Sequence, residues 1–315
     1  MRTTRSLSPL EQGMILLCCD LGDLDAAPLT TAQFRELSRR VLAAQAPADP
    51  LAQVREQTLL DLGYDRDFAA RVVTLLERRP RLERFLTGCR LRGIGIYTRI
   101  SPDYPRRLNK LRQYAPPVVL MAGDPALLEA DTIGLTGARD LGEAGALFAR
   151  RVGRLTAGED KVLVTGGARG ADHTALMTCL QRGGRAVIFP ARPLNEFYQT
   201  YRLFVENGQV LLCAEGSADA PFSAARASSR NRLIYRSSDR AFVAQAGDHT
   251  GGTWSGACEN LRRGWAPLYA NRDGGRGCEE LARKGAVLID ADHLQDYICR
   301  QVLPDEPEPA PLSLF

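Results

Sequence analysis

The sequence predicts an α/β protein built on a doubly wound, mostly parallel sheet that follows a small all-helical region. Two observations lead to this prediction. From about residue 92, short apolar runs rich in β-branched residues alternate with longer amphipathic stretches. Before that point, the apolar residues fit short helices. Strands that alternate with helices favour parallel pairing through right-handed crossovers.

The first ninety residues are expected to form short helices. Thr31 is a suitable N-cap for a helix that runs to Ala43, and further helices are expected over 49–62 and 67–78. Gly63 is favoured as a helix C-cap, although it would also suit the turn of a helix-hairpin-helix, where backbone N–H groups face a phosphate.

Strands and helices then alternate to about residue 290. Strands are expected at 95–97, 117–121, 133–136, 162–165, 186–189, 210–213, 241–244, 267–270 and 287–289. Helices are expected between them at 142–156, 171–182, 195–207, 229–237, 255–263 and 278–284. The proline- and acid-rich end can form neither helix nor sheet ladders. The expected division is a helical domain over 1–90, an α/β domain over 91–303 and a flexible tail over 304–315.

The composition is that of a globular protein with a formal net charge of +4. Only Lys110, Lys161 and Lys284 among the 41 basic residues are lysine. Arginine suits phosphate forks and base stacking, although a GC-rich genome would produce the same bias. No apolar run approaches the roughly 20 residues that span a bilayer, and no signal-peptide core follows the N-terminus. A cytoplasmic protein without membrane contact is expected.

Cysteine and histidine usage argues against a metal site. The eight cysteines are scattered without any C-x-x-C pair, and only three histidines are present. Such cysteines are typical of reduced, mostly buried thiols. Neither a metal nor a cofactor is expected.

Donor-rich segments follow the predicted strands at the edge where doubly wound sheets bind ligands. Glycines let the backbone approach an anion, the helix starting near Ala171 would aim N–H groups at it, and hydroxyls can donate to phosphate oxygens. The R-N-R run is expected to open a helix, whose N-terminus also attracts anions. The candidate binding residues are Gly137, Arg139, Gly166, Gly167, Arg169, Gly170, Arg230, Asn231, Arg232, Thr250, Gly251, Gly252 and Thr253. Their four arginines are expected to line one basic pocket, with no catalytic residue.

Two residues beside these candidates, Asp172 and Trp254, each have two possible roles. Asp172 would either cap the helix after the second segment or hold Arg169 in place. Trp254 would either stack on a base or pack in the core, the latter at least as plausible for a tryptophan.

Together these motifs resemble the Smf/DprA family over roughly residues 90–290. The family's Y-P-x-x-L segment is matched at 104–108, its G-S-R loop at 137–139 with alanine for serine, its S-G-x-A-R-G-I-D loop at 165–172 and its R-N-R-I-I segment at 230–234. The resemblance implies a Rossmann-like fold and single-stranded DNA binding. It also implies a role in DNA processing, uptake or recombination with a RecA-type recombinase as partner, and a homodimer. Residues 1–90 look like the family's small helical domain, of the SAM or helix-hairpin-helix type.

The chain departs from the family pattern and looks like a divergent branch. The family's K-S-G-S-L loop is replaced by H-T-G-G-T-W at 249–254, so its lysine is missing. Glu279 replaces the usual asparagine, and no winged helix is expected after Cys299.

A nucleotide-processing enzyme is the competing interpretation. The family's fold is similar to that of lysine-decarboxylase-like phosphoribohydrolases, whose P-G-G-x-G-T-x-x-E loop is echoed at 251–259. Glu259 would be a general acid or base if buried, or an exposed helix residue paired with Arg262 and Arg263. Non-catalytic DNA binding is favoured, because the basic segments exceed what a mononucleotide needs.

The chain ends in P-L-S-L-F, which resembles the sliding-clamp-binding pentapeptide Q-L-S-L-F. Leu312, Leu314 and Phe315 would enter an apolar groove of the clamp, or alternatively fold back onto this chain's own sheet or a partner subunit.

Overall fold

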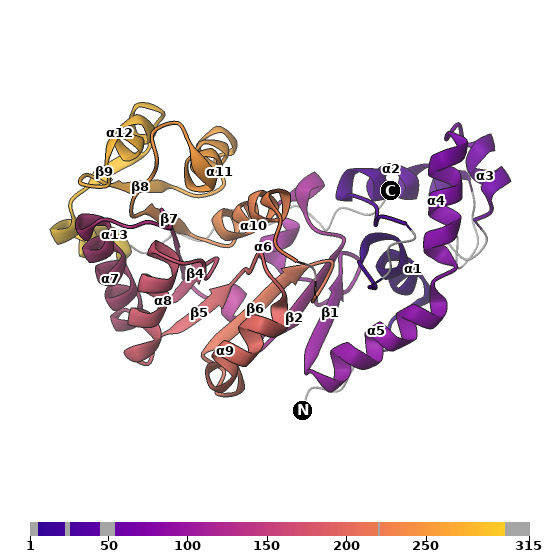
Figure 1. Ribbon diagram of the computed structural model, residues 1–315, viewed down its shortest axis with the longest axis horizontal. Helices are drawn as coiled ribbons and strands as arrows, with labels where there is room; N and C mark the ends of the chain where they lie inside the picture. Colours follow the sequence, from indigo (N-terminus) through magenta and orange to yellow (C-terminus); the bar gives the residue numbers. More distant parts are fainter. Residues whose placement is uncertain (1–5, 23–25, 45–53, 220, 300–315) are drawn as a thin grey trace.

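The computed structural model describes residues 6–22, 26–44, 54–219 and 221–299. Within these residues it confirms the predicted fold class: a nine-stranded, mostly parallel sheet lies between two helical layers, and a helical N-terminal region packs at one end of it (Figure 1). The strands, in chain order, are β1 (Ile94–Thr98), β2 (Val118–Ala122), β3 (Thr132–Thr136), β4 (Val162–Thr165), β5 (Arg185–Ile188), β6 (Val210–Glu215), β7 (Arg240–Val243), β8 (Leu268–Asn271) and β9 (Val287–Ile289).

The N-terminal helices are α1 (Pro9–Cys18), α2 (Thr31–Ala44), α3 (Glu56–Asp61), α4 (Arg66–Leu76) and α5 (Arg79–Leu91). α1 begins with a capping box, in which Ser8 and Glu11 each accept the other's backbone N–H. The cap of α2 is Thr30 and not the expected Thr31, because the Thr30 hydroxyl accepts the Gln33 N–H at 3.3 Å.

Two other sequence expectations for this region need correction. The helix expected over 49–62 begins only at Glu56 in the part of the chain that the structure describes, which resumes at residue 54 after the gap. α5 was not expected, because polar residues interrupt its apolar pattern and only Leu82 and Cys89 are buried. Gly63 has a φ of 82° just beyond α3, as a helix-ending glycine should.

The strands lie in the order β1-β2-β6-β5-β4-β3-β7-β8-β9. β3 to β9 are parallel, whereas β2 pairs antiparallel with β6, and β1 antiparallel with β2. Every residue of β2, β3, β4 and β7 is buried. Strands covered on both faces need continuous apolar runs, which is why this region was recognisable from the sequence.

Helices cover both faces of the sheet. α7 (Glu143–Gly158), α8 (Ala171–Gln181) and α9 (Leu194–Glu206) share one apolar core with the N-terminal helices and one sheet face. The opposite face is covered by α6 (Arg106–Asn109), α10 (Ala224–Arg236), α11 (Gly251–Arg263) and α12 (Arg276–Arg283). α13 (Leu294–Ile298) packs against α7, and the short 3-10 turns are η1 (Arg112–Tyr114), η2 (Pro125–Leu128) and η3 (Ala291–His293).

Two helices begin earlier than the sequence suggested. α10 was expected at 229–237 but starts at Ala224, after Ser223, whose hydroxyl accepts the Arg226 N–H at 3.2 Å. α11 was expected at 255–263 but starts at Gly251. The R-N-R run therefore lies in the middle of α10, and the expectation that it opens a helix is wrong. The A-A-R-A-S-S stretch that precedes it contains no large apolar residue, so it shows no amphipathic pattern that would signal a helix.

The chain reverses its direction of winding at β3. From β3 it proceeds through β4 and β5 to β6, and then α10 returns it to β7 on the other side of β3. The carboxyl ends of β3 and β7 thus form the topological switch point, which is where open α/β sheets bind ligands.

Candidate nucleic-acid interface

The segments after β3, β4 and β7, which we call the edge segments, meet at this edge and are joined by hydrogen bonds. The Ala138 N–H donates to the Gln245 carbonyl at 2.9 Å, and the Ala171 N–H donates to the Ala138 carbonyl at 3.2 Å. The Thr253 hydroxyl donates to the Gly137 carbonyl at 2.9 Å. Three segments that are distant in sequence therefore form one continuous surface, as their position after parallel strands predicts.

Gly170 is required by the way the first two segments touch. Its φ is 89°, and a Cβ there would lie 2.3 Å from the Ala138 oxygen and 2.6 Å from the Arg139 oxygen. Both contacts are to backbone, which cannot rotate away, so only glycine fits at this position.

Arg230, in the middle of α10, is the most buried of the four candidate arginines. Its side chain is only 11% exposed, and its Nη1 atom lies 3.6 Å from Oδ2 of Asp172, which is 7% exposed. Gly166 makes room for the guanidinium, because a Cβ there would lie 0.9 Å from Nη1. The buried Nε and Nη1 atoms have no hydrogen-bond partner among the described residues.

Burial shifts both groups of this pair in the direction of neutrality. Burial raises the pKa of Asp172, against which the Arg230 charge and the N–H groups of Ala168 and Gly166 act. Burial also lowers the pKa of the Arg230 guanidinium, against which Asp172 acts. The pair thus places a cation and a carboxylate at a substantial desolvation cost directly below the glycine-rich segment.

Asp172 plays neither of the two roles considered from the sequence. Its Oδ2 accepts the N–H groups of Gly166 and Ala168 at 3.2 and 3.3 Å. It therefore holds the glycine-rich segment in shape from the inside and pairs with Arg230 instead of Arg169. Those two N–H groups point at a carboxylate, so they are not the anion donors that the sequence suggested.

The exposed cations of the edge are Arg139 and Arg169. The Arg139 guanidinium carbon lies 5.3 Å from the centre of the Phe222 ring, a cation–π distance. Phe222 is 47% exposed, one of few large apolar side chains so placed among the described residues. Arg169 forms an exposed ion pair with Asp140, Nη2 to Oδ1 at 2.6 Å. Phe222 was missed from the sequence, because a lone phenylalanine before an unrecognised helix carries no signal.

The segment after β7 exposes Thr250, Gly251 and Gly252 as the first turn of α11 forms. Trp254 is only 8% exposed and packs in the core beneath α11, with the His249 ring 4.6 Å away. The core interpretation of this tryptophan is correct, and a base-stacking role for it is not.

Arg232 points away from Arg230. Residues two apart on a helix differ by about 200° in direction, and the Arg232 Nε donates to both carboxylate oxygens of Glu259 at 3.0 Å. The Asn231 amide donates to the Gly252 carbonyl at 3.1 Å. Of the four arginines expected in one pocket, the structure therefore places Arg139 and Arg169 on the edge, Arg230 below it and Arg232 on the outer side of α10.

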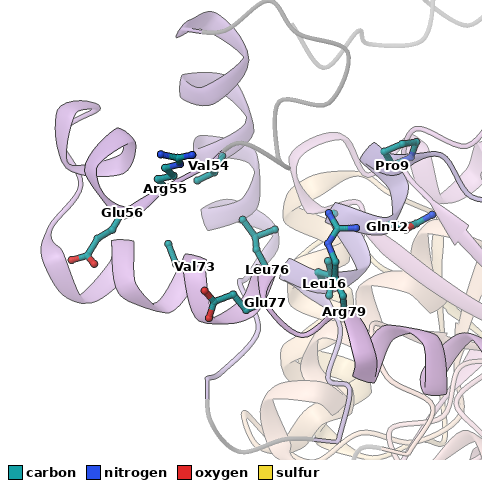
Figure 2. A pocket seen from close by; sticks show the side chains of 11 residues that line it. Pro9, Gln12, Leu16, Val54, Arg55, Glu56, Val73, Leu76, Glu77 and Arg79 are labelled. Carbon is teal, nitrogen blue, oxygen red and sulfur yellow. The ribbon is translucent and has the colours of Figure 1, made fainter.

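Other kinds of site have little support in the part of the chain that the structure describes. In the described ranges no three His, Cys, Asp or Glu side chains gather as a metal-binding group, and no helix there is long and apolar enough to cross a bilayer. A cavity of about 440 Å³ lies among the N-terminal helices, where apolar Leu16 and Leu76 meet charged Glu56, Glu77 and Arg79 (Figure 2). None of its lining residues belongs to the edge segments.

A doubly wound sheet whose switch-point edge carries glycine-rich turns, two exposed arginines and an exposed aromatic ring defines a Rossmann-like protein. Comparison with known proteins makes this assignment more specific. The sequence model of the family described as DNA recombination-mediator protein A matches residues 95–299. The chain belongs to this family.

Individual relatives agree with that assignment. The chain is 28% identical over 193 residues to the DNA processing protein DprA of Streptococcus pneumoniae. The aligned region covers 59% of this chain and 67% of the relative. The crystal structure of the S. pneumoniae protein is similar with a TM-score of 0.68 at 20% identity, over 93% of this chain and 98% of that one. DNA processing protein A of Helicobacter pylori, described for its single-stranded DNA binding mode, gives a TM-score of 0.54 at 22% identity, over 64% of this chain and 95% of that one.

Proposed function

We propose that this protein binds single-stranded DNA at the switch-point edge and acts in DNA processing, uptake or recombination without catalysing a reaction. Family membership supports the DNA-processing role, and a relative is described as binding single-stranded DNA. The binding residues proposed are those exposed on the edge, namely Arg139, Arg169, Phe222, Thr250, Gly251 and Gly252.

The observation that carries the proposal is the pairing of Arg139 with Phe222. An exposed phenyl ring beside a guanidinium offers a base a stacking surface and its phosphate a charge partner. A base can stack on a side chain only when it is not enclosed in a duplex. The arrangement therefore favours single-stranded DNA, with little dependence on sequence because every base has a π-face.

Buried residues support this surface from below. Arg230 and Asp172 hold the segment 166–170 in one conformation, and Thr253 ties the start of α11 to Gly137. A surface that is already ordered loses less conformational entropy when a flexible strand binds to it.

Titration of labelled oligo-dT tests the proposal. Arg139→Ala and Phe222→Ala should each weaken binding about tenfold, in the range of 1–3 kcal/mol that base stacking contributes. The matched controls are Arg182→Ala and Leu203→Ala, exposed residues at the end of α8 and on α9, outside the edge segments. Equal affinity for all four variants, or no binding by the unaltered protein, would overturn the assignment.

The nucleotide-processing alternative receives no support from the geometry of Glu259. Both of its oxygens accept hydrogen bonds from Arg232, and its side chain is only 14% exposed. A general acid or base needs an oxygen that can reach a substrate proton. The expected pairing with Arg262 or Arg263 is also replaced by the contact with Arg232. Nucleoside monophosphates added to the same titration should neither compete at micromolar concentration nor be hydrolysed.

The proposed partners beyond DNA rest on the family resemblance alone. They are a RecA-type recombinase and a second copy of this chain. The sliding clamp is a further proposed partner through Leu312, Leu314 and Phe315, which lie outside the described residues.

A further inference from the structure

The outer side of α10 carries a second cluster of cations, which the proposed function does not use. Its centre is the ring of Tyr114 in η1. The guanidinium carbons of Arg232 and Arg263 lie 5.6 and 5.1 Å from the centre of that ring. We refer to Tyr114, Arg232 and Arg263 as the outer cluster.

Each member of the outer cluster is held in place. The Arg263 Nη2 atom donates to the Tyr114 hydroxyl at 2.7 Å, and Arg232 is fixed through its Nε by the Glu259 carboxylate. Tyr114 itself packs against the apolar core beneath α6 and α10. Long side chains that are already ordered lose less entropy when they engage a ligand.

The cluster still has donors to offer. Among the described residues, the Nη atoms of Arg232 and the Nη1 atom of Arg263 make no hydrogen bond. The Arg232 side chain is 34% exposed, and Arg263 is exposed. Glu259 supplies one negative charge against the two guanidinium charges, so the cluster keeps a net positive charge.

The cluster continues from the proposed DNA-binding edge along the contact between α10 and α11. At the edge, Asn231 of α10 meets Gly252 at the start of α11. Farther along, Arg232 meets Glu259, and α11 ends at Arg263. Eleven residues of helix separate Gly252 from Arg263, a distance of roughly 16 Å at 1.5 Å per residue. A strand leaving the edge could cover this distance with a few nucleotides.

We propose that the outer cluster is a second phosphate-binding subsite, which takes the continuation of the same DNA strand beyond the switch-point edge. This proposal rests on the proposed function, since it assigns the cluster to the strand that the edge binds. The ligand chemistry is a phosphodiester backbone with unpaired bases: the free guanidinium nitrogens suit phosphate oxygens, and the guanidinium planes can stack on exposed bases.

The effect of Arg263→Ala on oligonucleotides of different length distinguishes this proposal from simple electrostatic attraction. An oligo-dT of four residues should fill the edge only, so Arg263→Ala should leave its affinity within twofold of the unaltered protein. An oligo-dT of twenty residues should reach the cluster, and Arg263→Ala should weaken its binding about five- to tenfold. The slope of log K against log salt should fall by about 0.7 for the lost contact.

Arg262→Ala is the matched control. It removes the same charge from the preceding residue of the same helix, which points in a direction about 100° away. It should change the affinity for the long oligonucleotide less than twofold. Tyr114→Phe keeps the ring and removes only the hydroxyl that Arg263 contacts, so it should give an intermediate loss.

The outcomes distinguish the two proposals. If neither oligonucleotide binds, the proposed function fails. If both bind but Arg263→Ala and Arg262→Ala have the same effect at both lengths, the edge assignment stands and the subsite is overturned. If Arg263→Ala weakens binding to a twenty-base-pair duplex as strongly as to oligo-dT, the cluster is a general polyanion surface and the assignment to an unpaired strand is wrong.

Discussion

Gly166→Ala tests whether the glycine-rich segment is built around the buried Arg230. The new Cβ would lie 0.9 Å from Nη1 and 2.2 Å from Cζ of Arg230, so the guanidinium must leave its position. Asp172, 7% exposed, would then lose the cation that opposes its desolvation. Breaking a buried ion pair in this way costs about 3–5 kcal/mol. Arg230→Ala should cost a similar amount, because it leaves the same carboxylate unpaired.

The double variant shows whether these two costs have one cause. If Gly166 serves mainly to admit Arg230, Gly166→Ala combined with Arg230→Ala should cost about as much as either change alone, giving a coupling energy of about 3 kcal/mol. Urea unfolding at pH 7 with an unchanged m-value measures each cost. Gly158→Ala is the control, since a Cβ there meets nothing within 4 Å. Additive costs, or a cost below about 1 kcal/mol for Gly166→Ala, would refute the reasoning.

The stability cost of Arg230→Ala should depend on pH. Burial raises the pKa of Asp172 in the folded state, so the folded protein holds this proton to higher pH than the unfolded chain does. The contribution of this carboxyl to stability therefore falls as pH rises from about 4 through the raised pKa. Removing Arg230 raises that pKa further, so the cost of Arg230→Ala should be smaller at pH 4 than at pH 7. An equal cost at both pH values would show that Asp172 is not the group left unpaired.

Three further predictions follow from the geometry and a fourth from the C-terminal sequence. Gly170→Ala should lower the free energy of unfolding by about 3 kcal/mol, since it strains a φ of 89° and meets two carbonyl oxygens; a change under 1 kcal/mol in urea unfolding would contradict this. Arg107→Ala should cost about 2 kcal/mol at pH 7 by removing hydrogen bonds of 2.7 and 2.9 Å to Asp239. Burial alone would raise the pKa of Asp239, but Arg107 and Thr132 outweigh burial and lower it. The stabilisation by this pair should therefore be lost as pH falls below about 4, which acid unfolding curves would show. Binding of oligo-dT should exceed binding of duplex DNA of equal length, and tighter duplex binding would exclude base stacking on Phe222. Removal of residues 310–315 should abolish clamp pull-down while leaving the melting temperature and oligo-dT affinity unchanged; a lower melting temperature would assign the tail to the fold.

Alternation of apolar strands with helices was enough to predict the α/β class, because strands covered on both faces must be continuously apolar. Glycines after β3 and β4 indicated that these two segments approach each other closely, since a side chain there would meet the backbone of the neighbouring segment. The family motifs pointed to the same residues. These features are local in sequence, and for that reason they could be recognised without coordinates.

Which side of a helix each cation faces was decided by the tertiary structure alone. Arg230 and Arg232 are two residues apart in one motif, yet one lies buried against Gly166 and the other pairs with Glu259. Their directions depend on where α10 begins, and the polar stretch before the motif concealed that start. Phe222 reaches Arg139 only because the return from β6 to β7 brings the start of α10 to the end of β3. Phe222 and Arg139 are 83 positions apart, so their spacing along the chain could not reveal a contact that the packing of the whole sheet creates.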